Sequence, residues 1–366
     1  MRRRRPAFLP AGSALARWLR EGPVSTRPRG AALWVYRWKG FWFDANWRRQ
    51  ESLYPASAFE GEGGQRLVFV VGFWRSGTTL LHELLAAAPG MSAPRTFQCM
   101  NPSGFRIAAT PDAGTAVSRP MDAVRVDAFS PQEDEFVLLA RGAPSVYRAW
   151  LDPRRWCETV DALEQETWLA LPEAKWLADW RTFLAWCMPA TATHLVVKSP
   201  NHVFRLRAIH RRWPRARFVW TVRDPVDTWQ SNRKMWGAMM AMYGLWGTDW
   251  EDLDRLLERA MLEYLAALRW AVGALDVRTV ACLDFERLSC ATAEVLAPLP
   301  ERLGLGSWHA WRPLLEERMR KSVQHQREKY DGAPALPAGS ELLVAQIREA
   351  HRELLGKLQV GKRGGS

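Results

Sequence analysis

The chain of 366 residues is 48% hydrophobic and 25% charged, which suits a folded globular protein with one large α/β domain or two smaller ones. Its net charge of +12, from 51 Lys and Arg against 39 Asp and Glu, favours an anionic partner such as a phosphorylated nucleotide, nucleic acid or a membrane surface. The cysteines form no C-x-x-C pair and the histidines no H-E-x-x-H pattern, so the composition argues against a disulfide framework and a zinc site and favours a reducing compartment.

The first 60 residues show no strand pattern. The N-terminus, MRRRRPAFLPAGSALARWLREG, mimics a secretory signal, but its apolar part is short, contains Pro10 and runs into Arg17, so we expect a disordered or amphipathic basic arm. The next segment, ALWVYRWKGFWFDANWRR, predicts an aromatic and basic helix that either packs on the domain, the commoner fate, or lies at a membrane interface. No apolar run reaches about 18 residues, so we expect no transmembrane helix and a cytoplasmic protein, with peripheral membrane contact through the basic N-terminus left open.

A strand, a glycine-containing loop and a helix follow one another after residue 66. The run LVFVVG predicts a strand buried on both faces, and TTLLHELLAAA, from Thr78, has helical periodicity and stops at Pro89. The loop between them, GFWRSGTT, nearly matches the phosphate-binding pattern G-x-x-x-x-G-K-[ST], but Thr78 replaces the lysine and Arg75 stands inside the loop. Such a loop presents backbone N–H groups and a helix N-terminus to an anion, although a plain strand–turn–helix has the same pattern.

Alternating helices and strands continue to the C-terminus. SPQEDEFVLLA predicts a helix that begins at Ser130 as N-cap, and NHVFRLRAIHRRW predicts a helix capped by Asn201. Further strands are predicted at THLVVKSP, which ends near Lys198, at RFVWTV, which precedes Arg223, and at VRTVACLDFERL. Further helices are predicted at residues 155–187, 251–274, 291–303 and 341–357 and from PVDTWQSNRKMW.

This order predicts an α/β fold with a mostly parallel central sheet flanked by helices. The first two strands are too far apart in sequence for a simple crossover, which indicates a helical insert at about residues 130–190. We expect three regions: a basic, aromatic N-terminal arm at 1–60, the main domain at 61–335, and a C-terminal helix and tail at 336–366. The tryptophans of the insert either pack its helices, our default, or line a ligand pocket.

Three cationic residues follow three of the predicted strands. Arg75 lies in the loop after the first strand, Lys198 ends the second and Arg223 follows the third. Ligands bind at the carboxyl edge of an open parallel sheet, so the three groups are expected to converge on one anion. Without a loop lysine or a clear Mg²⁺-binding acid, triphosphate hydrolysis is disfavoured, because Asp224 can simply cap the following helix.

Taken in this order, the segments GFWRSGTTLLHELL, VVKSPNH, RFVWTVRDPVDTWQS and LDFERL resemble the sulfotransferases that use 3′-phosphoadenosine 5′-phosphosulfate (PAPS), most closely the bacterial members with an R-S-G-T-T loop. The resemblance covers Val68 to about Leu288, with HQREKY at residues 325–330 similar to the family's C-terminal segment, and leaves out the first 60 residues. It implies a P-loop NTPase-like sulfotransferase fold and transfer of a sulfuryl group to a hydroxyl acceptor, either carbohydrate, lipid or small molecule. It also implies that no metal and no nucleic acid take part; the oligomeric state stays open.

The resemblance also implies roles for individual residues. The residues expected to hold the 5′-phosphosulfate are Arg75, Ser76, Gly77, Thr78 and Thr79. Arg223 and Ser231, eight residues apart, are expected to hold the 3′-phosphate. Arg75 is an expected catalytic cation, because many family members have a lysine at this position, beside the leaving phosphate. Lys198 is the second expected catalytic cation, on the separate ground that it lies at the carboxyl end of a strand.

The catalytic base has no clean match to the family. Glu133 and Glu135, beside Asp134, are candidates at a helix start, where acids also complement the helix dipole. His82, one turn into the helix after the loop, is a further candidate that packing in the core would equally explain. Thr96 and Gln98 are polar candidates for the acceptor pocket. A kinase-like nucleotide enzyme and a non-catalytic protein that binds anionic lipid or nucleic acid are the alternative functions.

Overall fold

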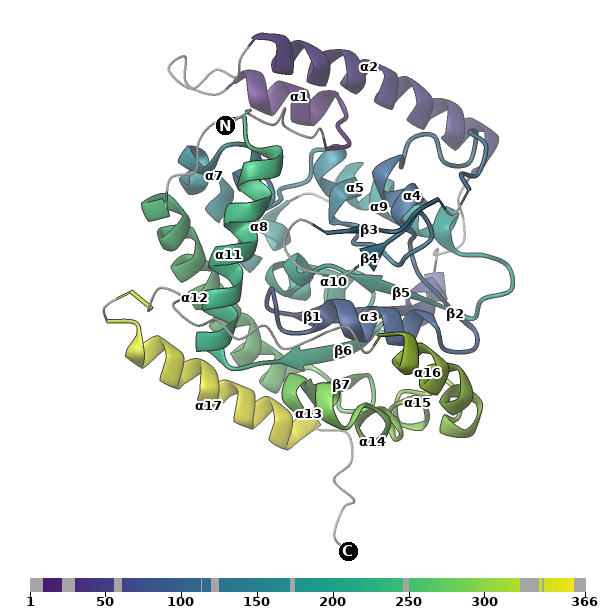
Figure 1. Ribbon diagram of the computed structural model, residues 1–366, viewed down its shortest axis with the longest axis vertical. Coiled ribbons are helices and arrows are strands. Elements are labelled where there is room, and N and C mark those ends of the chain that lie inside the picture. Colours follow the sequence, from purple (N-terminus) through teal and green to yellow (C-terminus); the bar gives the residue numbers. More distant parts are fainter. Residues whose placement is uncertain are drawn as a thin grey trace, which may run out of the picture.

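A parallel five-stranded sheet forms the centre of the protein, with strand order β2-β5-β1-β6-β7 (Figure 1). The computed structural model describes residues 9–21, 30–55, 61–112, 114–119, 125–171, 175–245, 250–322, 336–337 and 339–358. The strands of the sheet are β1 (Leu67–Gly72), β2 (Met91–Ser92), β5 (His194–Lys198), β6 (Arg217–Val222) and β7 (Val280–Asp284). A separate antiparallel pair consists of β3 (Val117–Ser118) and β4 (Arg125–Val126).

Helices cover the sheet on both faces, as expected for the α/β class. The α-helices before β5 are α1 (Ser13–Arg20), α2 (Gly30–Leu53), α3 (Thr78–Ala86), α4 (Thr96–Met100), α5 (Glu135–Ala140), α6 (Arg148–Leu151), α7 (Trp156–Val160), α8 (Gln165–Ala170) and α9 (Lys175–Cys187). Those after it are α10 (Leu206–Arg212), α11 (Pro225–Tyr243), α12 (Trp250–Ala274), α13 (Phe285–Cys290), α14 (Thr292–Leu296), α15 (Leu299–Arg302), α16 (Trp308–Ser322) and α17 (Glu341–Leu358). Short 3₁₀ helices are η2 (Gly61–Arg66), η3 (Pro153–Arg155) and η4 (Pro200–Arg205).

Strand β1 is buried on both faces, which confirms the interpretation of LVFVVG. Phe69 and Val71 point into the larger core, together with side chains of α9, α11 and α12. Val68 and Val70 point into a second core, which α3, α13, α14 and α16 complete on the opposite face. The alternation follows from the two-residue period of a strand.

The segment between β1 and β5 carries the predicted helical insert, with α5 to α9 inside it. Its tryptophans pack its own helices, as expected: Trp150, Trp168 and Trp180 are at most 2% exposed. Trp180 also lies against Trp213 and Phe69, so the insert and the sheet share one core. The insert is therefore a rigid part of the fold, which allows it to position side chains at the edge of the sheet.

Several helix starts differ from the sequence predictions. Helix α5 begins at Glu135 instead of Ser130, because the Ser130 hydroxyl donates to Asp127 Oδ1 (2.8 Å) and its carbonyl accepts from Thr96 N (2.9 Å). Ser199, not Asn201, caps the helical turn after β5. The strand predicted at VRTVACLDFERL ends at Asp284, which caps α13 instead. Helix α16 was not predicted. The segment HQREKY lies outside the described residues.

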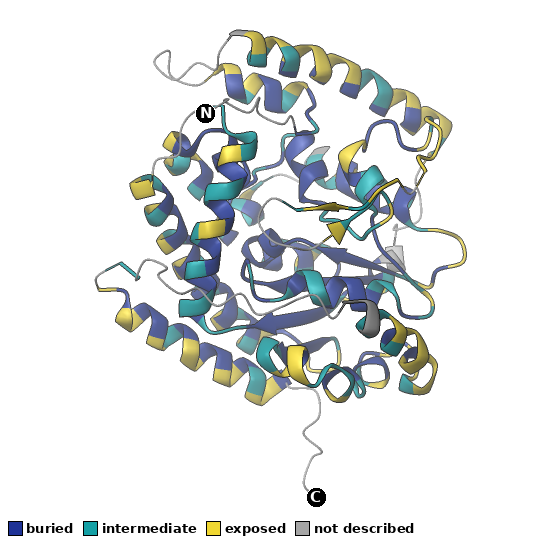
Figure 2. Ribbon diagram, viewed as in Figure 1, coloured by how far each residue is buried: buried dark blue, intermediate teal, exposed yellow. Residues whose placement is uncertain are grey.

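The N-terminal region packs on the same core as the main domain. Leu15 and Leu19 of α1 are buried together with Tyr36 and Trp47 of α2, so residues 13–20 follow the amphipathic alternative for the basic arm. In Figure 1, α1 and α2 lie side by side along one end of the molecule. Figure 2 shows that the outer side of α2 is largely exposed. None of the helices that the described residues form is long and apolar enough to cross a membrane.

Candidate functional site

The loop between β1 and α3 is a tight turn that depends on its glycines. Gly77 has φ +91° and Arg75 has φ +68°, both in the left-handed region that side chains rarely adopt. A Cβ on Gly77 would collide with the ring of Phe285, so glycine is required there for space as well as for conformation. Helix α3 begins directly afterwards at Thr78, and no side chain caps its first turn. Its N-terminal N–H groups therefore form an anion-binding end at the carboxyl edge of the sheet.

Arg75 and Arg223 connect the loop to the segment after β6. Arg75 Nε donates a hydrogen bond to Ser231 Oγ (2.8 Å), and Arg223 Nη1 donates to the Arg75 carbonyl (3.2 Å). The Asp224 carboxylate caps α11 through Val226 N (2.9 Å), as expected, and α11 then carries Ser231 back to the loop. The two motifs, far apart in the sequence, thus form one continuous polar surface.

The Arg223 guanidinium is mostly buried but incompletely paired. It lies 4.8 Å from the centre of the Phe285 ring, and its carboxylate neighbours Asp227 and Glu286 are 3.8 and 3.9 Å away. Within the described part of the chain its buried Nε has no hydrogen-bond partner. Buried donors are normally satisfied, so this arginine has the capacity to bind a further anion.

Lys198 ends β5 and is buried against the insert. Its Nζ donates to Glu133 Oε1 (2.5 Å) and to Thr79 Oγ1 (3.2 Å), so it joins the loop helix to the acidic segment. Burial lowers the pKa of Lys198, and the Glu133 carboxylate counteracts that effect. Tyr147 OH donates to the other carboxylate oxygen of Glu133 (2.5 Å), and burial raises the pKa of that phenol. Glu133 therefore contacts Lys198 directly and lies near Thr79 at the start of α3, with one carboxylate oxygen bonded to Lys198 and the other to Tyr147.

The other two acidic neighbours have structural partners. Glu135 is fully buried and accepts from Arg205 Nη1 and Nη2 at 2.7 and 2.9 Å, and from the Ser145 and Ser199 hydroxyls. Burial alone would raise the pKa of Glu135, but Arg205 and these hydrogen bonds lower it to about 2. Asp134 accepts from Trp180 Nε1 (2.5 Å) and lies 3.0 Å from His202 Nε2. A carboxylate so fully engaged is a poor proton acceptor, so the geometry argues against Glu135 as the base.

His82 points into the core, as in the second explanation that the sequence allowed, packing in the core. It is 1% exposed, and its Nε2 lies 3.3 Å from the Val196 carbonyl of β5. Burial, with a smaller contribution from the charge of Lys198, lowers the pKa of His82 to about 3. Because the ring is shielded from the edge of the sheet, His82 is not placed to serve as a base there.

Three other candidate residues already form hydrogen bonds within the protein: Ser76, Thr96 and Gln98. Ser76 is fully buried, and its hydroxyl donates to the Phe73 carbonyl (2.7 Å), so it stabilises the loop. Thr96 donates to the Ser130 carbonyl (3.0 Å), and Gln98 accepts from Arg95 N (2.8 Å). Thr79, at the start of α3, is partly exposed, and its hydroxyl accepts from Lys198 Nζ (3.2 Å).

Sequence reasoning missed Tyr147 and Arg205, which position the acidic segment. No motif marks Tyr147, which lies in an irregular stretch, and its role follows only from its contact with Glu133. Arg205 belongs to the arginine-rich segment 205–223, whose side chains have different partners in the structure. It is buried against Glu135, whereas Arg217 donates to backbone carbonyls, so the segment forms no single basic patch. The described residues contain no group of three or more His, Cys, Asp and Glu side chains arranged for a metal ion.

The chain is similar to known proteins both in sequence and in structure. Residues 68–310 match the model of the sulfotransferase family. Omega-hydroxy-beta-dihydromenaquinone-9 sulfotransferase Stf3, from Mycobacterium bovis and from Mycobacterium tuberculosis, is 27% identical over 267 residues, which cover 72% of this chain and 69% of the relative. The match to the family model spans the loop, Lys198, Arg223 and Ser231.

Two solved structures share the fold at low sequence identity. Sulfotransferase STF1 from Mycobacterium tuberculosis H37Rv is 17% identical, with 87% of this chain and 86% of that chain covered and a TM-score of 0.55. Sulfotransferase STF9 from Mycobacterium avium is 16% identical, with 98% and 95% covered and a TM-score of 0.58. At such identity the likeness shows the fold, and it confirms the expected parallel-sheet sulfotransferase architecture.

The Glu135–Arg205 pair predicts a pH-dependent stability. We expect Glu135→Gln to lower the free energy of unfolding by about 3 kcal/mol at pH 7, because it leaves a buried guanidinium without its counter-charge. The folded pKa of about 2 lies below the ordinary value of 4.5, so the contribution is complete above about pH 4.5 and disappears as the pH falls towards 2. Urea unfolding of both proteins across this range should show the difference shrinking.

The matched control is Glu166→Gln, at a carboxylate that pairs with Arg207 but is 75% exposed. We expect it to change the free energy of unfolding by less than about 1 kcal/mol. Equal stability of Glu135→Gln and wild type at pH 7 would contradict the structural role assigned to Glu135.

Proposed function

The chain belongs to the sulfotransferase family, and we propose that it transfers a sulfuryl group from PAPS to a hydroxyl acceptor by in-line displacement. One observation carries the proposal: three cationic residues lie at the carboxyl ends of adjacent strands, at a single edge of the sheet. Arg75 follows β1, Lys198 is the last residue of β5 and Arg223 follows β6. This concentration of cations beside the N-terminus of α3 suits a donor that carries phosphate at two positions.

The residues of the loop would hold the 5′-phosphosulfate. The α3 N-terminus offers backbone N–H groups, with Thr78 and Thr79 as hydroxyl donors, and Arg75 supplies a positive charge from within the turn. Arg223 and Ser231 would hold the 3′-phosphate. The buried Nε of Arg223, which forms no hydrogen bond with any described residue, supports this assignment, because a phosphate oxygen would supply a hydrogen-bond acceptor.

The bound donor would supply the electrophilic sulfuryl group, and the chain's own residues would manage charge and the acceptor proton. Glu133 is the proposed base, which accepts the hydroxyl proton on a carboxylate oxygen. Lys198 Nζ donates to Glu133 Oε1 at 2.5 Å, so this carboxylate oxygen is occupied while the contact lasts. We infer that Lys198 turns its charge towards the sulfuryl oxygens and the leaving phosphate during transfer, which frees Glu133 to accept the proton.

The acceptor is proposed only as a class, a molecule with a free hydroxyl group. The curated relatives are named for a hydroxylated menaquinone, which is a lipid. We therefore propose lipid alcohols as the first acceptors to test, before carbohydrates and small phenols. The mechanism above requires only that the hydroxyl reach Glu133 and face the donor in line.

The donor assignment predicts that Arg223→Ala weakens the binding of adenosine 3′,5′-bisphosphate. Loss of charged hydrogen bonds to a phosphate should raise the dissociation constant by about 10- to 100-fold in isothermal titration calorimetry. The matched control is Arg233→Ala. Arg233 lies on α11, two residues beyond Ser231, and pairs with Asp254 (2.5 Å). The control should bind normally, and a normal affinity for Arg223→Ala would refute the 3′-phosphate assignment.

The base assignment predicts a selective loss of turnover in Glu133→Gln. With a hydroxyl acceptor that the wild type sulfates, kcat should fall by about 10²- to 10⁴-fold, because the amide cannot accept the proton. The affinity for adenosine 3′,5′-bisphosphate should stay within about threefold of wild type. A kcat close to wild type in this variant would exclude Glu133 as the base, whereas a lost nucleotide affinity would assign it to donor binding.

A further inference from the structure

Helix α2 carries large aromatic side chains on both of its faces. The inner face packs Tyr36, Phe43 and Trp47 into the core. The outer face exposes four aromatic side chains that share one side of the helix at spacings of three and four residues and form what we call the aromatic ridge: Trp34 (63% exposed), Trp38 (55%), Phe41 (64%) and Trp42 (49%). Single exposed apolar residues are ordinary, but a contiguous ridge of this kind marks an interaction surface.

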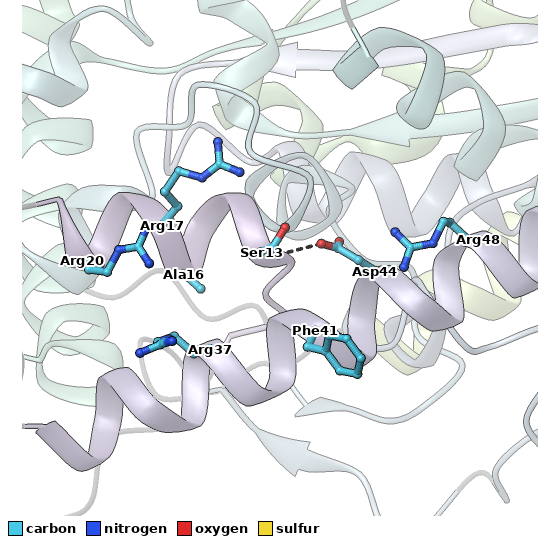
Figure 3. A pocket seen from close by; sticks show the side chains of 8 residues that line it. All are labelled: Ser13, Ala16, Arg17, Arg20, Arg37, Phe41, Asp44 and Arg48. Carbon is cyan, nitrogen blue, oxygen red and sulfur yellow. Dashed lines mark hydrogen bonds between the residues drawn. The ribbon is translucent and has the colours of Figure 1, made fainter.

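An arginine-lined cleft adjoins this ridge. A hollow of about 400 Å³ lies between α1 and α2. Figure 3 shows the side chains that line it, with Phe41 of the ridge among them. The arginines that line it are Arg17, Arg20, Arg37 and Arg48. Within the described residues, none of these four side chains forms an ion pair. Asp44, the carboxylate of the cleft, is already engaged by Ser13 N (3.2 Å) and Arg141 (3.2 Å).

The charge of the two helices identifies the kind of partner. Residues 13–21 and 30–53 carry six Lys or Arg side chains against three Asp or Glu. Aromatic rings flanked by basic groups suit the interface of an anionic bilayer, where the rings enter the headgroup region and the guanidinium groups meet phosphates. A second copy of the chain fits less well, because pairing two such faces would bring unpaired arginines together.

We propose that the α1–α2 face docks on an anionic phospholipid surface, with the aromatic ridge inserted among the headgroups and the arginine cleft on lipid phosphates. This surface is a docking site for the membrane itself and is separate from the donor site. It places the protein on the bilayer by its N-terminal end, with α2 lying in the plane of the interface.

The docking face is firmly joined to the candidate site. Gly12 N, before α1, donates to the Ala140 carbonyl at the end of α5 (2.9 Å), and Arg141 bonds both Asp44 of α2 and Asp179 of α9. Helix α5 spans six residues, about 9 Å, and Glu133 lies just before its other end. If the proposed function holds, α5 therefore connects the docking face to the segment that carries Glu133.

Sedimentation of the full-length protein with vesicles tests the proposal without any substrate. Vesicles of phosphatidylcholine alone are compared with vesicles that also contain phosphatidylglycerol. We expect wild type to bind the anionic vesicles at least tenfold more tightly than the neutral ones, with about 100-fold lost in Arg17→Gln/Arg37→Gln/Arg48→Gln. Trp38→Ser/Phe41→Ser/Trp42→Ser should lose at least tenfold.

Matched controls lie on α17, which is remote from α2 in Figure 1. Leu342→Ser, at a side chain that is 69% exposed, and Arg352→Glu, at an exposed arginine, should bind vesicles like wild type. Equal binding to neutral and anionic vesicles, no binding to either, or full binding by the ridge variant would each overturn the proposal. So would a wild-type dimer in light scattering that the ridge substitutions convert to monomer. Because vesicle binding needs no donor or acceptor, its failure would leave the proposed sulfuryl transfer untouched.

Discussion

The buried contact between Glu135 and Arg205 determines how the insert meets the sheet. Glu135 receives two hydrogen bonds from Arg205 and one each from Ser145 and Ser199, so α5 is held against the turn that follows β5. Lys198 immediately precedes Ser199, and Glu133 lies two residues before Glu135. Because Glu135 is held against Ser199, their neighbours Glu133 and Lys198 are brought together, with 2.5 Å between Glu133 Oε1 and Lys198 Nζ. A buried ion pair adds little net stability relative to a well-packed apolar pair, although removing one partner is costly. Its hydrogen bonds also fix how α5 sits against the turn after β5.

The donor side of the site depends on a second constraint, the left-handed turn at Arg75 and Gly77. An arginine in this conformation is strained, and the surroundings hold it: its carbonyl accepts from Arg223 and its side chain donates to Ser231. The strain directs the Arg75 side chain along the edge of the sheet, towards α11. Because Gly77 adopts the left-handed conformation, α3 begins at the next residue, Thr78, and its N-terminal N–H groups face the same edge.

The sequence predicted the sheet, the loop and the convergence of cations because each has a local pattern. LVFVVG has the length and Val content of a strand buried on both faces, and parallel strands end at a common edge. It did not separate Glu133 from Glu135, because side chains in the irregular segment before α5 point in directions that only tertiary contacts decide. It did not place His82 either, because the packing of α3 against β5 decides which way this side chain points. The N-caps at Ser130 and Asn201 failed for the same reason, because Ser130 bonds instead to Asp127 and Asn201 accepts from Trp74 Nε1. The aromatic residues of α2 likewise give no signal in the sequence of which ring faces the core.

The central claim is that the edge formed by Arg75, Lys198 and Arg223 binds a nucleotide with separate 3′- and 5′-phosphates and not a triphosphate. Its most direct test is a calorimetric titration of the wild-type protein with adenosine 3′,5′-bisphosphate in the absence of divalent metal, and with Mg-ATP in parallel. The account predicts saturable one-site binding of the bisphosphate and much weaker binding of Mg-ATP. Tight binding of Mg-ATP, with no binding of the bisphosphate, would contradict it.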